Sequence, residues 1–152
     1  MKMKSSQKPK PHELIEHTAD VGLRVFAPCV QGLYVNAAKG MFAVIAGRNI
    51  RIKKEAGLKR IKFELNITAR NREELLVGWL NELLTLFDIH DLIFTRFKIN
   101  LCTTKQIKAL AWAEPLNTQT YIRKTEIKAV TYHQLKIKKI AGVFAAEIIF
   151  DI

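Results

Sequence analysis

The sequence predicts an α+β fold in which two helices pack on a mixed, mostly antiparallel sheet within a single domain. Three observations lead to this expectation. Two segments show helical apolar periodicity, about six show the alternation typical of strands, and the strands fall largely in hairpins rather than in strict strand–helix alternation. A chain of 152 residues is long enough to bury one substantial core.

The first half of the chain is predicted to contain two strands around a helix. "GLRVFAP" alternates apolar and other side chains and is closed by Pro28, which indicates a short strand. Apolar residues then recur at steps of three and four from Leu33 to Ile45, and Gly47 is a suitable C-terminal cap for this helix. "IKFELNIT" at 61–68 alternates strictly, which predicts a strand with one buried face.

The second half is predicted to hold the longer helix and two hairpins. "NREELLVGWLNELLTLFD" carries an apolar stripe, with Asn71 and Glu74 at capping-box spacing. "FTRFKINLC" and "QIKALAWAE" alternate on either side of 103–105 and predict a hairpin. "HQLKIKKI" and "VFAAEIIFDI" predict a second antiparallel pair, turning near Ala141 and Gly142.

Charge and composition narrow the function classes. The net charge is +11, and basic residues gather in 1–10, 48–62 and 121–140, so RNA or an acidic protein face could be attracted, although a solubilising surface explains the same pattern. No apolar run approaches the roughly 20 residues of a membrane span. Residues 1–11 are basic without an apolar segment behind them, which predicts a mobile tail and a cytoplasmic protein. Cys29 and Cys102 are expected to stay reduced.

The familiar catalytic motifs are absent. The sequence has no GxSxG, HExxH, P-loop or Rossmann glycine pattern. The four histidines are scattered without the i, i+4 spacing of a helical zinc site. A self-sufficient enzyme is therefore disfavoured. A metal-dependent hydrolase remains an alternative, and its general base would have to be His17 or His133.

Two acidic positions do not fit a core. Asp20 stands among small and apolar residues at the start of a predicted strand, so its carboxylate is expected at the rim of the core, where it needs a hydrogen-bond donor or a cation. Asp151 is followed by Ile152 and its carboxylate, and adjacent carboxylates repel unless a hard cation such as Mg²⁺ or Ca²⁺ joins them. A local turn capped by Asp20 and His17 is the simpler interpretation of the first position.

Four stretches in order resemble the archease family. They are "HTADVGLRVFAP", "LLVGWLNELLTLFD", "EIKAVTYHQLKI" and the final "FDI", and the resemblance covers residues 12–152, with 1–11 as the tail. Archeases have an α+β single-domain fold. The resemblance implies a non-enzymatic cofactor protein of the GTP- and metal-dependent tRNA-splicing RNA ligase, which promotes guanylylation of that ligase and its multiple turnover. The alternative is a basic RNA-binding module acting on tRNA.

The resemblance also implies a metal site. The family's ligands fall on Asp20, Asp151 and Ile152, and the ion would be Ca²⁺ or Mg²⁺, with Mn²⁺ as a further candidate. His17 would orient Asp20 from the same turn. Three residues of the third stretch would face the ligase or its nucleotide: Lys128, Thr131 and His133. A weak or indirect RNA contact and no membrane contact are expected.

One segment departs from the family pattern. Archeases commonly carry a "GE", an Asp and a His ahead of "IKAVTYH". This chain has "AEPLNTQTY", so that Ala113, Asn117 and Tyr121 replace the Gly, the Asp and the His. A negative charge and a titrating group are thereby lost, and a functional role for this loop is in doubt.

Overall fold

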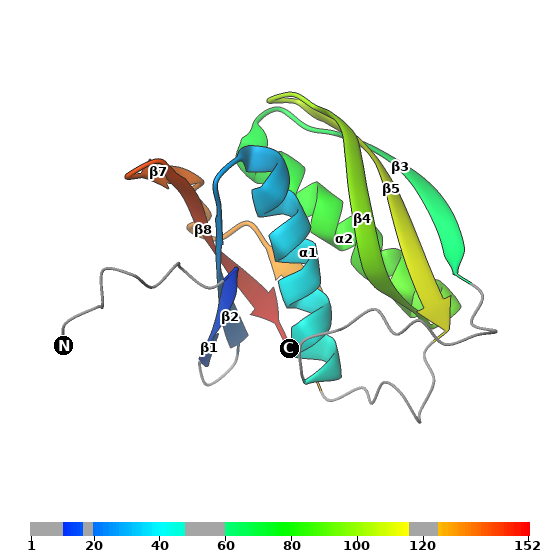
Figure 1. The fold of residues 1–152 in the computed structure, drawn as a ribbon. Helices are drawn as coiled ribbons and strands as arrows, with labels where there is room; N and C mark the ends of the chain where they lie inside the picture. The colour runs from blue at the N-terminus through cyan, green and yellow to red at the C-terminus, as the bar shows by residue number, and fades with distance from the viewer. Residues whose placement is uncertain (1–10, 17–19, 48–59, 116–124) are drawn as a thin grey trace.

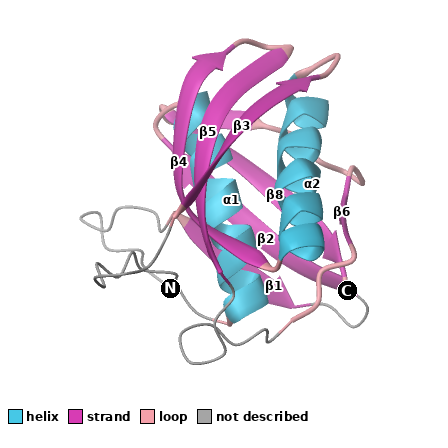
Figure 2. Ribbon diagram, turned by 90° about the vertical axis from the view of Figure 1, so that its right-hand side faces the viewer, coloured by secondary structure: helices cyan, strands magenta, loops and turns pink. Residues whose placement is uncertain are grey.

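The computed structural model describes residues 11–16, 20–47, 60–115 and 125–152, which form three layers (Figure 1). Helices α1 (Val30–Ala46) and α2 (Arg72–His90) make the middle layer, between a five-stranded and a three-stranded sheet (Figure 2). The α+β prediction with two helices is confirmed. The sequence predicted one mixed sheet, whereas the described strands divide between two sheets and pair antiparallel throughout.

The five-stranded sheet is organised around its last strand, β8. The strands follow the order β1-β2-β8-β6, and β7 pairs with β8 beside β6. Their bounds are β1 (His12–Glu16), β2 (Asp20–Ala27), β6 (Ala129–Thr131), β7 (Lys138–Ile140) and β8 (Val143–Asp151). The predicted β7–β8 turn is confirmed, because Ala141 and Gly142 both have positive φ, 51° and 80°. Such a pair of left-handed residues is typical of a tight hairpin turn.

Two parts of this sheet differ from the sequence prediction. Strand β1 was not anticipated, because "HELIE" is short and mostly polar. The strand expected over "HQLKIKKI" is confined to Lys138–Ile140. Residues 133–137 leave the sheet because Gln134 has φ 56° and turns the chain, and because Leu135 is buried in the core with 6% of its surface exposed.

The three-stranded sheet contains the predicted hairpin. It has the order β3-β5-β4 and is formed by β3 (Ile61–Thr68), β4 (Leu92–Cys102) and β5 (Gln106–Pro115). Thr103 closes the hairpin: its Oγ1 accepts from the N–H groups of Lys105 at 3.2 Å and Gln106 at 2.9 Å. These bonds satisfy turn donors that β4 and β5 leave unpaired.

The helices begin and end where the sequence indicates. Asn71 Oδ1 accepts from the N–H of Glu74 at 2.9 Å, which is the predicted N-cap of α2. The Glu74 carboxylate reaches back one residue further than in a capping box and accepts from the N–H of Arg70 at 3.1 Å. Gly47 ends α1 in the left-handed conformation, with φ 72°. Cys29 is the N-cap of α1, and its Sγ accepts from Gly32 N–H at 3.4 Å.

Both faces of the helix layer are buried. The largest fully buried side chains come from all three layers and include Trp79, Tyr34, Phe42, Phe94 and Phe150. Trp79 Nε1 donates to the Tyr34 carbonyl at 2.9 Å, so the indole nitrogen is satisfied inside the core. Both cysteines are free. Within the described ranges, no helix has the length and apolarity to cross a bilayer.

Candidate metal site and its surroundings

Asp20 and Asp151 lie directly opposite each other in the sheet. Asp20 opens β2, Asp151 closes β8, and the antiparallel register pairs the two residues. Side chains on directly opposed residues of an antiparallel pair have Cβ atoms about 5 Å apart. The fold therefore brings together the two acidic positions that the sequence singled out, from opposite ends of the chain.

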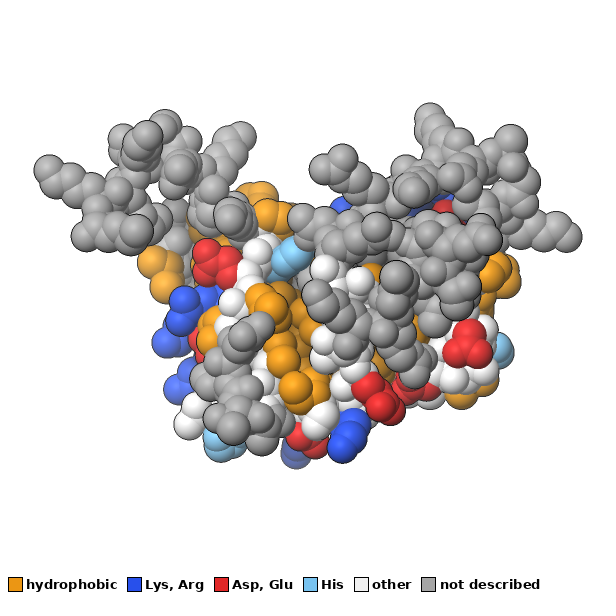
Figure 3. All heavy atoms as spheres, turned by 90° about the horizontal axis from the view of Figure 1, so that it is seen from below, with side chains coloured by type: hydrophobic (Ala, Val, Ile, Leu, Met, Phe, Trp, Pro, Cys, Tyr) orange, Lys and Arg blue, Asp and Glu red, His pale blue; other side chains and the backbone are white. Residues whose placement is uncertain are grey.

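Both carboxylates project away from the core. The next pair in the ladder, Val21 and Phe150, is buried against the helices, and strand residues alternate between faces. Asp20 is half-buried and Asp151 is exposed. The end of the molecule toward which β8 runs is seen in Figure 3, where hydrophobic side chains reach the surface between acidic and basic ones.

One oxygen of this pair has no donor among the described residues. Asp20 Oδ1 is buried and has no hydrogen-bond partner among the described residues. A buried carboxylate oxygen without a donor costs free energy, and a hard cation satisfies such an oxygen directly. The chemistry of the residues present therefore fits a divalent ion that prefers oxygen ligands. The predicted set of Asp20, Asp151 and the Ile152 carboxylate contains only such ligands.

The described residues contain no larger metal-ligating cluster. No group of three or more His, Cys, Asp or Glu side chains converges within those ranges. The predicted ligand set contains only two side chains, those of Asp20 and Asp151, beside the Ile152 carboxylate. A hard cation held there would keep several waters in its coordination shell, as Mg²⁺ usually does.

Strand β6 places the "IKAVTYH" stretch beside Asp151. Ala129 is the register partner of Asp151 on the side opposite to Asp20, and Lys128 N–H donates to the Asp151 carbonyl at 2.7 Å. Thr131 lies two register positions further along, opposite Ile149, and its Oγ1 is buried without a partner among the described residues. Two of the three residues expected to contact a partner, Lys128 and Thr131, thus lie next to the aspartate pair.

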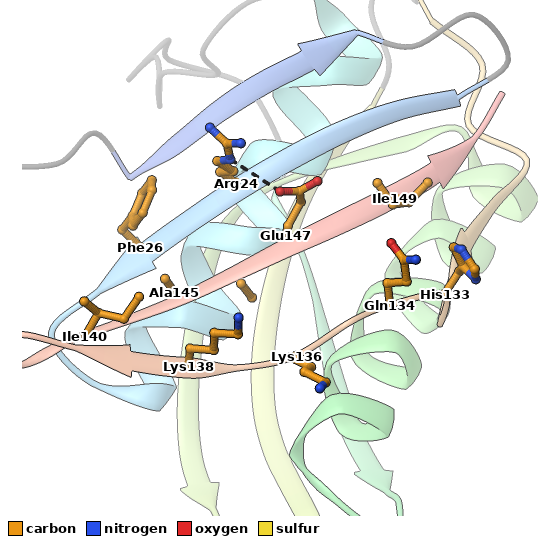
Figure 4. Close-up of a pocket in the computed structure, with 11 residues that line it drawn as sticks. Arg24, Phe26, His133, Gln134, Lys136, Lys138, Ile140, Ala145, Glu147 and Ile149 are labelled. Carbon is orange, nitrogen blue, oxygen red and sulfur yellow. Dashed lines mark hydrogen bonds and ion pairs between the residues drawn. The ribbon is translucent and has the colours of Figure 1, made fainter. Parts of the chain in front are cut away.

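His133 lies in the turn that follows β6, outside the strands, at a pocket of about 370 Å³. Figure 4 shows this pocket between β8 and residues 133–138, on the face that carries the two aspartates. Across its floor, Arg24 Nε and Glu147 Oε2 are 3.4 Å apart. Both side chains are about half exposed, at 53% and 47%, so this ion pair stabilises the fold little. Lys136 and Lys138 add positive charge to the wall.

The remaining predicted residues divide by location. His17, Asn117 and Tyr121 lie outside the described residues. Ala113 is fully buried in β5 of the three-stranded sheet, where it pairs with Ile61 of β3 and Phe94 of β4. It therefore takes part in the core and is remote from the aspartate pair in the fold.

Sequence reasoning missed the contacts by which α2 and its N-cap Asn71 position β6 and the segment that follows it. Asn81 contacts Val130, Glu73 Oε1 accepts from Ile137 N–H at 3.3 Å, and Tyr132 OH lies 3.5 Å from Asn71 Oδ1. The only available signal was a polar amide inside the apolar stripe of the helix. That signal does not say which distant segment the amide contacts.

Comparisons with known proteins agree on one family. The model of the archease protein family (MTH1598/TM1083) matches residues 12–152. "Protein archease" of Methanosarcina mazei is 37% identical over 147 residues, covering 94% of this chain and 97% of that protein. "Protein archease" of Pyrococcus abyssi is 34% identical over 147 residues, covering 94% of this chain and 99% of that protein.

Solved structures show the same architecture. The solution structure of Methanobacterium thermoautotrophicum protein 1598 has a TM-score of 0.70 at 26% identity and covers 93% of this chain and 99% of its own. The crystal structure of a Thermotoga maritima archease, titled a possible chaperone, has a TM-score of 0.61 at 21% identity. It covers 99% of this chain and 100% of its own, and at that identity it supports the fold alone. With the family model spanning both aspartates and relatives above 30% identity, this chain belongs to the archease family.

Proposed function

We propose that this protein is a non-enzymatic activator of the tRNA-splicing RNA ligase. It would bind the ligase transiently in the cytoplasm and promote its guanylylation and repeated turnover in tRNA splicing or RNA repair. Membership of the archease family supports the proposal. The observation that carries it is the pairing of Asp20 with Asp151, with Asp20 Oδ1 buried and without a donor among the described residues.

Three carboxylates would hold the ion. Asp20, Asp151 and the Ile152 carboxylate supply hard oxygen ligands, which suit Ca²⁺, Mg²⁺ or Mn²⁺. A divalent cation bound there would stabilise the negative charge that develops on phosphate oxygens during nucleotidyl transfer. The chain itself supplies the rigid frame: β2 and β6 flank β8 and fix the backbone of Asp151 on both sides.

The same face offers groups for a partner. Lys128 is exposed beside Asp151, and His133, Lys136 and Lys138 line the pocket further along β8. A lysine ammonium is a compact charge that contacts phosphates or carboxylates. The ligase is therefore expected to dock on the outer face of the five-stranded sheet, and the aspartate pair is expected to lie within the contact surface.

The test uses the purified ligase and this protein in trace amount. Guanylylation is followed with labelled GTP, and RNA joining is followed over many turnovers. Asp20→Asn and Asp151→Asn are expected to lower the turnover rate about tenfold or more, toward that of the ligase alone. Asp88→Asn, an exposed position on α2, removes the same charge elsewhere and should activate normally. Full activation by both folded site variants would disprove the site assignment.

The alternative function, a metal-dependent hydrolase, predicts a different result in an assay of the protein alone. A hydrolase would need a base beside the aspartate pair, and His133 lies outside the strands, at the pocket. We expect no turnover of generic phosphate esters by the protein alone with Mg²⁺, Ca²⁺ or Mn²⁺. Metal-dependent turnover that Asp20→Asn removes would favour the hydrolase instead.

A further inference from the structure

No described helix or strand covers the outer face of the three-stranded sheet. Both helices pack against the inner face of this sheet, and in Figure 2 the outer face is turned to the viewer, in front of the helices. The inner face is apolar, with Ala109, Ala111 and Ala113 of β5 buried. Residues of the opposite parity therefore form a surface on the far side of the helix layer from the aspartate pair.

The register arranges this surface in rows of three. Strand β5 is central, so each of its outward residues has one neighbour on β3 and one on β4. The rows are Lys62–Trp112–Arg96, Glu64–Leu110–Lys98 and Asn66–Lys108–Leu101. Cations stand in every row, and one acid stands among four of them. The face carries a net positive charge around a strip of aromatic and aliphatic side chains.

Trp112 is held at the surface by a cation. It is half-buried, and the Arg96 guanidinium lies 5.0 Å from the centre of its ring. This is the geometry of a cation–π contact, which arginine and tryptophan form readily. Lys62 flanks the same ring on the opposite strand. An aromatic ring between two cations can stack on a base while its neighbours contact phosphates.

We propose that this face binds a single-stranded polynucleotide. The charge is complementary to a phosphate backbone, and base–aromatic stacking tolerates any sequence because every base has a π-face. An antiparallel sheet that presents aromatic and basic side chains is a platform that several RNA-binding modules share. A duplex hides its bases from such a platform, so single strands fit the combination of Trp112 with Lys62, Lys98 and Lys108.

The inference is independent of the ligase proposal. The four cations lie on β3, β4 and β5, whereas the aspartate pair lies on β2 and β8 of the other sheet. A variant of one face leaves the other intact. The protein would then hold an RNA strand on one side while its other side engages a partner.

Tryptophan fluorescence offers a local readout. The chain has two tryptophans, and Trp79 is fully buried, so a ligand on the sheet surface can stack only on Trp112. We expect a 15-nucleotide oligo(U) to quench the protein fluorescence, and oligo(dT) to do the same, since stacking and phosphate contacts are common to both. Trp112→Leu should weaken binding about tenfold and abolish the quenching.

Charge variants and a matched control complete the test. The pair Lys98→Glu with Lys108→Glu should weaken binding and reduce the salt slope, log Kobs against log salt, from about −3 toward −1.5, because each phosphate contact to a single strand contributes about −0.7. Lys39→Glu with Lys139→Glu makes the same charge change at exposed positions of α1 and β7, away from this face, and should bind polynucleotide as the wild type does. Thermal melting checks that each variant is folded.

Four outcomes would overturn the proposal. Equal losses in the two charge-reversed pairs would mean that binding is spread over the whole basic protein. Binding without fluorescence quenching, or equal binding of a duplex of the same length, would remove Trp112 from the contact. Absence of binding by the wild type at 50 mM salt would remove the site altogether, whereas the local, quenchable and salt-dependent binding described above would support it.

Discussion

Asn81 of α2 binds both backbone groups of Val130 in β6. Its Oδ1 accepts from the Val130 N–H at 3.1 Å, and its Nδ2 donates to the Val130 carbonyl at 3.4 Å. Val130 is the central residue of a three-residue strand whose other side pairs with β8. One side-chain amide thus takes the place of a neighbouring strand on the outer edge of β6. The position of Lys128 and Thr131 beside Asp151 depends on this contact.

Asn81→Leu should loosen β6. The substitution leaves the N–H and carbonyl of Val130 without their partner, which costs about 1–3 kcal/mol of unfolding free energy. Hydrogen exchange of the Val130 amide is expected to accelerate more than that of amides in β2. Thr85→Ala, at an exposed position of the same helix, is the control and should change neither quantity. Unchanged protection of Val130 in a folded Asn81→Leu protein would contradict this account of the edge.

Divalent ions should stabilise the fold through the aspartate pair. An ion at ten times its Kd adds about 1.4 kcal/mol to the unfolding free energy, which corresponds to a rise of about 3–6 °C in Tm for a chain of this size. Ca²⁺, Mg²⁺ and Mn²⁺ are compared by thermal melting, and EDTA should reverse the shift. Asp20→Asn and Asp151→Asn should abolish it, whereas Asp88→Asn should keep it. A shift that survives both site variants places the ion elsewhere.

Gly40→Ala should destabilise the protein although alanine is the better helix former. A Cβ at this position would lie 2.6 Å from Leu23 Cδ2 and 3.2 Å from the His12 side chain. The gain in helix propensity is about 1 kcal/mol, and overpacking of a buried contact costs about 1–3 kcal/mol. We expect a net loss of unfolding free energy in urea titrations. Gly78→Ala meets only one methyl group of Ile67, at 3.1 Å, and should be closer to neutral.

His12 should make the fold sensitive to acid. Burial lowers the pKa of His12 below its ordinary value of 6.5. Below pH 6.5 the unfolded chain therefore binds a proton that the folded chain does not, so the unfolding free energy falls from pH 6.5 down to the pKa of the folded state and changes no further for this group. His12→Gln should flatten this part of the pH profile in urea titrations between pH 8 and 5.

Local structure followed from the sequence where periodicity and caps were strong. The alternation of Ile61–Thr68 and the Asn71 cap of α2 are both observed. The division into two sheets could not be foreseen, because alternation tells which side chains share a face and not which helix surface that face covers. Strand β6 was hidden for a different reason: three residues held by a helix amide carry no periodic signal.

The prediction of the candidate site rested on two kinds of evidence, the neighbours of Asp20 in the sequence and the family resemblance. A carboxylate at the rim of the core was inferred from the neighbours of Asp20, whereas the register places it on the outer face of the sheet, where its Oδ1 is nevertheless buried. The pairing of Asp20 with Asp151 came from the family resemblance, since no local pattern links residues so far apart. The predicted identity of the ion and the ligase contact stay predictions.

Strand β8 is the last element in the chain and the central strand of its sheet. While the polypeptide is being synthesised, β1, β2 and α1 leave the ribosome long before β8, which pairs with the other edge of β2. Nascent chains stalled before residue 143 would have β2 paired with β1 on one edge only, and an unpaired strand edge makes such intermediates prone to aggregate. Protein quality control in the cell is therefore expected to recognise truncated translation products of this gene quickly.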